Sequence, residues 1–291
     1  MELVSKLESI WKNKDHPLLI SDGKELFFKD IQISQTVDLN EINAGDVVVL
    51  IGDYNSVCIK SLFQLIDMKV IVAPITNDTK SQHKYFIEEI SAKYVIENNK
   101  ITRTGIAEEN NKLINKLREA DSAGFIFFSS GSSGKPKAIL HNVNNLLKKY
   151  EKPRRQLKAV NFLMFDHLGG INTFLHIIFN CGTIIALENR NVKHVIDTCN
   201  KYQVQLLPTT PTFLRMLLLS GYIPNKIPES LKIITYGTES MDSHTLIELS
   251  RLLPNVQFRQ TYGLSEFNAF RIKSESNNSL YFLVQRKSKH S

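Results

Sequence analysis

The chain has 291 residues, of which 42% are hydrophobic and 22% are charged, and it carries a formal net charge of +7. These values are typical of a globular protein with room for one large or two modest domains, and the positive charge suits a polyanionic partner. No long apolar run and no signal-peptide pattern occurs, which argues against a membrane span and against export. Cys58, Cys181 and Cys199 are widely spaced in apolar stretches, so we expect reduced core thiols and a cytoplasmic protein.

Residues 1–121 show short apolar runs that alternate with longer amphipathic segments, and we expect them to form a first α/β subdomain. Apolar triplets at 18–20 and 26–28 flank the sequence Ser-Asp-Gly-Lys, which predicts a β-hairpin. The polar stretch 98–121 is expected to separate this subdomain from the next. The other elements predicted here are strands at 47–51, 70–74 and 94–97 and helices at 57–66 and 81–90.

The same alternation continues over residues 122–273, which we expect to form a second α/β subdomain, followed by a polar basic tail at 274–291. Short strands that alternate with longer helices predict mainly parallel sheets covered on both faces. The expected fold class is therefore α/β with two stacked subdomains. The strands predicted in this part are 124–128, 162–165, 183–187, 204–208, 231–235 and 256–259, and the helices are 142–150, 170–180, 192–202, 211–220 and 243–253.

A loop rich in serine and glycine follows the apolar strand 124–128, since residues 129–137 read Ser-Ser-Gly-Ser-Ser-Gly-Lys-Pro-Lys. Gly131 and Gly134 allow positive φ and close approach of the backbone to a ligand, so successive N–H groups can form an anion-binding nest. Lys135 and Lys137 add positive charge. The loop therefore indicates a polyphosphate site, with a flexible linker as the weaker alternative. The spacing is not that of a Walker A loop, and no Gly-x-Gly-x-x-Gly occurs.

The loop resembles the phosphate loop of the adenylate-forming enzymes, the superfamily of acyl-CoA synthetases, luciferases and peptide-synthetase adenylation domains. The sequence departs from the family pattern at Ser133, where threonine is usual, and at Ala138, where glycine is usual. The resemblance covers about residues 15–272. Further motifs in family order are Gly45-Asp46 with the apolar run to Gly52, Asp166-His167-Leu-Gly-Gly170, Pro211-Thr212, Tyr236-Gly237-Thr238-Glu239 and Thr261-Tyr262-Gly263-Leu264-Ser265-Glu266.

The resemblance implies a ligase that adenylates a carboxylic acid with ATP and Mg²⁺ and then passes the acyl group to CoA or another thiol. Lys137 would be the main positive charge on the phosphates, Ser265 would donate to the α-phosphate, and Glu266 would bind Mg²⁺. The other residues to which the resemblance gives a role are Ser129, Ser130, Gly131, Ser132, Ser133, Gly134 and Lys135 for the phosphates, Tyr262, Gly263, Gly237, Thr238 and Glu239 for the adenine, and His167 and Gly170 for the acyl pocket.

The sequence alone leaves a structural interpretation open for several of these residues. Tyr262 could end a strand, Ser265 could cap a helix, and Glu266 could be a solvated carboxylate. His167 is equally compatible with a core or helix-start position and with the acyl pocket. The basic cluster at 148–158 has a single aromatic neighbour and indicates a solvated helix end rather than nucleic-acid binding.

The family's later β-rich part, its ribose-binding aspartate, its hinge and the C-terminal domain with the catalytic lysine have no counterpart after Phe267. We therefore expect a truncated member of the family, for which three interpretations are open. The chain could be a ligase fragment that is inactive when isolated, or half of a split enzyme whose missing C-terminal half is supplied by a second chain. It could also be a catalytically silent ATP- or acyl-binding remnant or the unstable product of a truncated gene. A separate C-terminal domain or a carrier protein is the macromolecular partner that the resemblance implies. The carboxylic acid itself is not indicated by the sequence.

Overall fold

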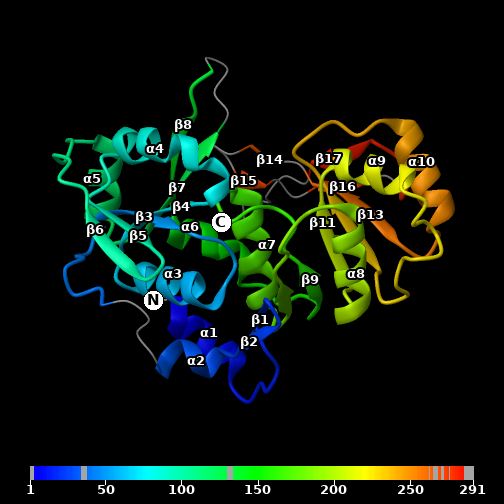
Figure 1. Cartoon of the computed structure of the whole chain (residues 1–291), viewed down its shortest axis with the longest axis horizontal. Coiled ribbons are helices and arrows are strands. Elements are labelled where there is room, and N and C mark those ends of the chain that lie inside the picture. The colour runs from blue at the N-terminus through cyan, green and yellow to red at the C-terminus, as the bar shows by residue number, and fades with distance from the viewer. Residues whose placement is uncertain are drawn as a thin grey trace, which may run out of the picture. The chain divides into compact units, whose positions relative to one another are not determined.

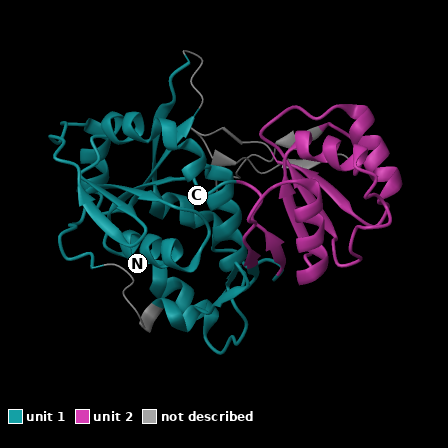
Figure 2. Cartoon of the chain, viewed as in Figure 1, with its two compact units in different colours: residues 1–156, 164–183 teal, residues 157–163, 184–291 magenta. Residues whose placement is uncertain are grey.

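The computed structural model describes residues 3–33, 38–129, 134–261, 263–264, 268–269, 272–274 and 276–284 (Figure 1). The chain divides into two compact units, one of residues 1–156 and 164–183 and one of residues 157–163 and 184–291 (Figure 2). Each unit is built on a mainly parallel sheet with helices on its faces. The predicted α/β class is therefore confirmed.

Unit 1 contains a six-stranded sheet in the order β6-β5-β3-β4-β7-β8. The four inner strands are parallel, while β6 and β8 pair antiparallel at the two edges. All residues of β3 and β4 are buried, which is the pattern of central parallel strands covered on both faces. The strands are β3 Val47–Ile51, β4 Ile71–Ile75, β5 Tyr94–Glu97, β6 Lys100–Arg103, β7 Gly124–Ser129 and β8 Lys137–Asn142.

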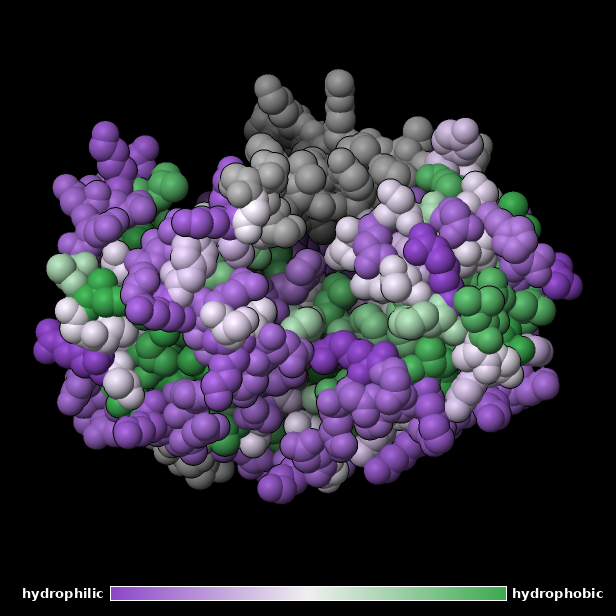
Figure 3. Space-filling view, turned by 45° about the horizontal axis from the view of Figure 1, so that its top comes forward, coloured by the Kyte–Doolittle hydropathy of each residue, from purple (hydrophilic) through white to green (hydrophobic). Residues whose placement is uncertain are grey.

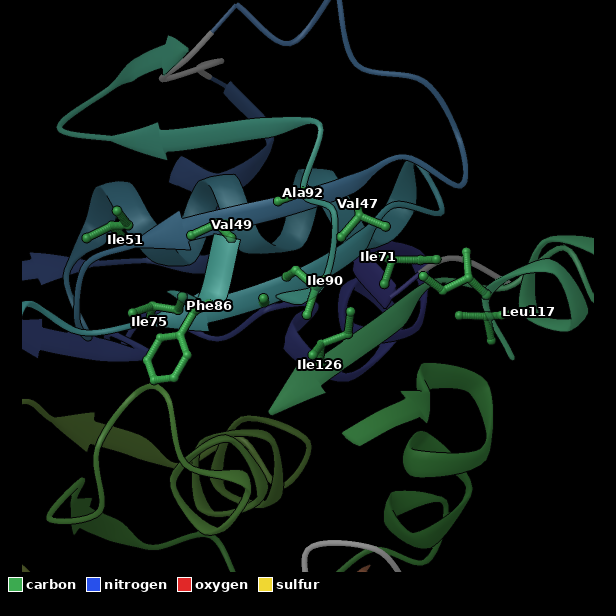
Figure 4. Close-up of a cluster of buried hydrophobic side chains, with 12 residues drawn as sticks. Val47, Val49, Ile51, Ile71, Ile75, Phe86, Ile90, Ala92, Leu117 and Ile126 are labelled. Atoms are coloured by element: carbon green, nitrogen blue, oxygen red, sulfur yellow. The ribbon is translucent and has the colours of Figure 1, made fainter. Parts of the chain in front are cut away.

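One face of this sheet is covered by α4 and α5, which bury apolar side chains against β3, β4 and β7 (Figure 4). Phe86 and Leu117 come from these two helices and meet Ile126 of β7 in the same core cluster. The helices of unit 1 are α1 Leu3–Trp11, α2 Phe28–Ile33, α3 Ser56–Asp67, α4 His83–Glu89, α5 Lys112–Glu119, α6 Val143–Leu147 and α7 Leu168–Ile178, with 3-10 turns at Asn77–Gln82 and Lys148–Tyr150.

The predicted N-terminal hairpin is confirmed by strands β1 Leu19–Ser21 and β2 Lys24–Leu26, which pair antiparallel. Its two-residue turn places both Asp22 and Gly23 at positive φ, 50° and 71°. This is the conformation that a tight hairpin requires and that an Asp-Gly pair adopts readily.

In unit 2, the strands follow the order β13-β12-β11-β9-β10, and β9, β11, β12 and β13 are parallel neighbours. Two short antiparallel ladders, β14 with β15 and β16 with β17, follow later in the chain. The elements are β9 Lys158–Val160, β10 Thr183–Ile185, β11 Leu206–Thr209, β12 Ile233–Tyr236, β13 Gln257–Gln260, β14 Gly263–Leu264, β15 Asn268–Ala269, β16 Ile272–Ser274, β17 Phe282–Val284, α8 Val192–Tyr202, α9 Pro211–Leu219 and α10 Ser243–Leu252.

The stretch 98–121 was expected to separate two subdomains, but it contains β6 and α5. Strand β6 pairs with β5, and α5 buries Ile114 and Leu117 in the core of unit 1. Strand β7, expected to begin the second subdomain, pairs in parallel with β4 of the same sheet. The division between the two units therefore lies at residues 156 and 184 rather than at residue 121.

The predicted strand at 162–165 is wrong, because the ladder ends earlier, at β9 Lys158–Val160. Beyond β9 the carbonyl oxygen of Phe162 accepts a hydrogen bond from Arg190 Nε at 2.6 Å, and the Phe162 ring packs edge-on against Phe213. Aromatic residues are buried here by side-chain packing and not by strand pairing.

The molecular face drawn in Figure 3 is mainly hydrophilic, with scattered hydrophobic areas. Within the described ranges, no helix combines the length and the apolar character that crossing a bilayer demands. All three cysteines are free; Cys58 and Cys199 are buried and Cys181 is partly buried. The expectation of reduced core thiols is therefore confirmed for Cys58 and Cys199.

Candidate functional site

The loop at 129–137 connects two antiparallel strands, because Ser129 at the end of β7 lies opposite Lys137 at the start of β8. Ser130, Gly131, Ser132 and Ser133 lie outside the described residues. Gly134 has a φ of +82° and open space around its Cα, so it holds a conformation that a residue with a Cβ adopts only under strain. Lys135 and Lys137 are exposed, and Lys137 has no ion-pair partner among the described residues.

Helix α4 anchors both ends of this loop. The Tyr85 hydroxyl donates a hydrogen bond to the Pro136 carbonyl oxygen at 2.8 Å. The Phe86 ring stacks on Phe128, with centroids 4.1 Å apart. The contacts restrain the backbone on either side of the predicted phosphate-binding segment, which lowers the entropy that ligand binding would cost.

In unit 2, the segment after β12 comes very close to the segment after β13. The backbone N–H of Thr261 donates to the Tyr236 carbonyl oxygen at 2.7 Å. A Cβ at position 237 would lie 2.3 Å from Thr261 Oγ1 and 2.6 Å from the Thr261 carbonyl oxygen, so only glycine fits. Thr238, the next residue, has a positive φ of 70°. The two strand ends therefore form a closely packed edge at the carboxyl side of the sheet, the side at which ligands bind in open α/β sheets.

The carboxylate of Glu239 binds the N-terminus of α9. Its Oε2 accepts from the Thr212 backbone N–H at 3.1 Å and from the Thr212 hydroxyl at 2.5 Å. A negative group at this end of a helix satisfies an orphan N–H and interacts favourably with the helix dipole. Glu239 is exposed, and its position gives a structural reason for the Gly-Thr-Glu and Pro-Thr motifs to occur together.

His167 caps the N-terminus of α7, where its Nδ1 accepts from the Gly169 backbone N–H at 2.9 Å. Burial lowers the pKa of the His167 imidazole, and the neighbouring Asp166 opposes this effect. The ring is therefore neutral at pH 7, with its proton on Nε2. Gly170 is buried in the first turn, and its N–H donates to the His167 carbonyl oxygen at 2.9 Å.

The predicted residues Tyr262, Ser265 and Glu266 lie outside the described residues, and only the backbone of Gly263 is described, in β14. Within the part of the chain that the structure describes, no group of three or more His, Cys, Asp or Glu side chains is arranged to hold a metal ion. The predicted magnesium ligand therefore stays a prediction.

Buried polar atoms at the carboxyl ends of three parallel strands have no hydrogen-bond partner within the part of the chain that the structure describes. They belong to Asn161 after β9, Thr209 in β11 and Gln260 in β13. Thr209 and Gln260 both lie level with Tyr236 in the sheet register. Buried groups without a partner are uncommon and are often explained by a missing ligand or water. The sequence analysis did not identify these residues, and their only signal was their position at the ends of predicted strands.

Comparisons with known proteins agree on the family. The sequence profile of the family described as AMP-binding enzyme matches residues 43–279. The chain is 23% identical over 166 residues to 4-coumarate–CoA ligase-like 6 of Arabidopsis thaliana. This aligned segment covers 53% of the chain and 29% of the Arabidopsis protein. The chain is 25% identical over 158 residues to acyl-CoA synthetase 7 of Caenorhabditis elegans, covering 49% of this chain and 29% of that protein. The matched region thus spans under a third of these relatives.

Solved structures share the fold at low sequence identity. The luciferase-like enzyme from Zophobas morio superposes with a TM-score of 0.73 at 16% identity, over 91% of this chain and 72% of the other. The o-succinylbenzoate CoA synthetase of Bacillus subtilis gives a TM-score of 0.71 at 15% identity, over 90% and 74%. The family match covers most of the chain, and the chain therefore belongs to the AMP-binding enzyme family, the adenylate-forming superfamily that includes the acyl-CoA synthetases.

Proposed function

We propose that the chain binds ATP and adenylates a carboxylic acid. The observation that carries the proposal is the family match over residues 43–279. In the proposed reaction a carboxylate oxygen attacks the α-phosphorus of ATP, the bond from this phosphorus to the bridging oxygen breaks, and pyrophosphate leaves with the electron pair. The product is an acyl-AMP, whose acyl group would then pass to CoA or another thiol.

We assign the ATP phosphates to the loop at 129–137. Support comes from the anchoring of this loop by Tyr85 and Phe86 and from the exposed ammonium group of Lys137, which has no ion-pair partner among the described residues. Negative charge builds up on the phosphates during adenylation, so donors that are held in place before the reaction stabilise the transition state most. The donors proposed to act with Lys137 are Ser129, Lys135 and the backbone N–H groups of the loop.

For the adenine we propose Gly237, Thr238 and Tyr262, with Gly263 beside them. Support comes from the position of Gly237 directly after β12, at the carboxyl side of the sheet, where open α/β sheets bind ligands. Ser265 would donate to the α-phosphate, and Glu266 would hold Mg²⁺, which supplies charge neutralisation on the phosphates when bound. Glu239, also predicted near the adenine, would act by holding the segment against α9.

The acyl substrate and the acceptor are proposals at the level of chemical class. We propose His167 and Gly170 as part of the acyl pocket, where a neutral imidazole would not attract the carboxylate by charge. The names of relatives point to two kinds of acceptor, since one is a 4-coumarate–CoA ligase-like protein and another is a D-alanine–D-alanyl carrier protein ligase of Streptococcus pneumoniae. CoA and a carrier protein are accordingly the proposed acceptors, and the free cysteines favour a cytoplasmic reaction.

The assignment of Lys137 is tested by the affinity for ATP. A charge-assisted contact with a phosphate contributes about 1.5–3 kcal/mol, so Lys137→Ala should raise the Kd for ATP about ten- to hundredfold. The matched control is Lys100→Ala, which removes an exposed lysine from β6 of the same sheet. An unchanged Kd in Lys137→Ala, or an equal loss in Lys100→Ala, would remove the phosphate role.

A further inference from the structure

A pocket of about 470 Å³ opens at the carboxyl ends of the parallel strands of unit 1. Residues from β3 and β5, from the segment 76–78 that follows β4, and from the start of α3 line it. Its volume lies in the range of small-molecule sites, and its position is the one at which open parallel sheets bind ligands. The pocket is formed by unit 1 alone and contains none of the residues proposed for ATP or the acyl group.

Ser61 gives this pocket an unused polar group. The residue lines the pocket from α3, is fully buried, and its Oγ has no hydrogen-bond partner among the described residues. A serine inside a helix usually bonds back to a carbonyl oxygen of the preceding turn, so a free hydroxyl at such a place is unusual. A ligand in the pocket would supply the missing partner.

The charged groups around the pocket indicate the sign of the charge that a ligand should carry. Asp78 contributes an exposed carboxylate, and no lysine, arginine or histidine occurs among the described residues that line the pocket. The N-terminus of α3 also faces the pocket, but its dipole amounts to about half a charge, and Asn55 already accepts from the Cys58 N–H at 2.9 Å. The full negative charge of Asp78 outweighs this half charge, so an anion is disfavoured and a cation is favoured.

The remaining lining divides into an apolar and an amide part. Leu50, Val57 and Ile96 contribute hydrocarbon surface, while Asn98 and Asn99 contribute amides from the turn between β5 and β6. Both asparagines have positive φ, 49° and 65°, as a two-residue hairpin turn requires. A ligand that matches these surfaces has a hydrocarbon body and a group that donates several hydrogen bonds.

We propose that this pocket of unit 1 binds a small organic amine in its protonated form. The ammonium group donates to the carboxylate of Asp78, to amide oxygens and to Ser61 Oγ, while the hydrocarbon part covers the apolar lining. Binding involves no covalent step and does not require ATP.

Three probes of similar shape test the charge preference. 2-Phenylethylamine is cationic, 2-phenylethanol is neutral and phenylacetate is anionic, and their binding to the full chain without ATP can be followed by NMR of the Asn98 and Asn99 side-chain amides. The proposal predicts that the amine binds most tightly and the anion most weakly. Equal or tighter binding of phenylacetate, or no saturable binding of the amine, overturns it.

Two variants locate the binding. Ser61→Ala removes a hydroxyl that has no partner in the described ranges, so the fold should be retained while amine affinity falls about two- to tenfold. Asp78→Asn removes an exposed charge and should weaken the amine about two- to fivefold, with no such loss for the alcohol. The matched control, Asp22→Asn, changes an exposed aspartate in the β1–β2 turn and should leave affinity unchanged. Amine affinities that stay unchanged in both pocket variants would refute the site, whatever the result for ATP.

Discussion

Replacing Gly237 by alanine should destabilise unit 2 at the edge where we propose that the adenine binds. The new Cβ would lie 2.3 Å from Thr261 Oγ1 and 2.6 Å from the Thr261 carbonyl oxygen, against an ordinary contact of 3.4–4 Å. A side-chain oxygen can rotate away, but the carbonyl oxygen belongs to the backbone that follows β13. Relief of this contact therefore requires the two strand ends to separate.

The expected cost follows from these two contacts. Overpacking of a filled site costs about 1–3 kcal/mol, and a clash with backbone places Gly237→Ala in the upper part of this range, at about 2–3 kcal/mol. Gly221 serves as a control in the same unit, because its φ is +74° but nothing lies within 4 Å of a Cβ there. Gly221→Ala should cost only the strain of a left-handed residue, about 1 kcal/mol.

Urea unfolding of five proteins measures these differences: wild type, Gly221→Ala, Gly237→Ala, Thr261→Ala and the double variant of Gly237→Ala with Thr261→Ala. Thr261→Ala removes the Oγ1 contact together with a 3.1 Å hydrogen bond to the Tyr236 carbonyl oxygen, and should cost about 0.5–1.5 kcal/mol. The double variant should be at least as unstable as Gly237→Ala, because the carbonyl contact persists. The reasoning is refuted if Thr261→Ala restores the double variant to its own stability, or if Gly237→Ala is no less stable than Gly221→Ala.

Two further predictions concern stability. Glu239→Gln removes the negative charge at the start of α9 and should cost about 0.5–1 kcal/mol in urea unfolding, with a smaller cost at high salt; the same loss at every salt concentration would contradict a charge effect. Burial, helped by Arg154 and Lys149, lowers the pKa of His176 to about 4, below its unfolded value near 6.5, so the folded state binds fewer protons. Its contribution to stability is complete above about pH 6.5 and is lost as the pH falls toward 4, on the order of 2–3 kcal/mol in all. Thermal unfolding of His176→Gln between these pH values should show a shallower fall than wild type, and parallel profiles would contradict the assignment.

The sequence predicted those elements in which local pattern and tertiary packing agree. The β-branched run of β3 and the helical spacing of α3 are examples, and both form within a residue of the predicted bounds. Helix α5 was missed because only Ile114 and Leu117 are buried among eight residues, so its composition is that of a polar linker. Whether a polar segment of this kind forms a helix that packs on the sheet depends on the apolar surface of the sheet, and this surface cannot be predicted from the residues of the segment alone.

The candidate site was predictable as a set of motifs and not as a geometry. Glycine at position 237 could be placed in a family motif, but the contact with Thr261 depends on the register of β12 and β13. The hydrogen bond from the Thr212 hydroxyl to the Glu239 carboxylate joins residues 27 positions apart. It forms only because the first residues of α9 lie next to the segment that follows β12. The missing hydrogen-bond partner of Ser61 among the described residues could not be predicted, because the sequence does not show whether the hydroxyl of a buried helical serine is hydrogen-bonded.

The most direct test of the central claim is carboxylate-dependent exchange of pyrophosphate into ATP, measured with the purified chain and Mg²⁺ over a panel of fatty, aryl and amino acids. The account predicts exchange with at least one carboxylate, with a clear loss of rate in Lys137→Ala and none in Lys100→Ala. Retained ATP binding without exchange for any carboxylate would contradict adenylation by this chain.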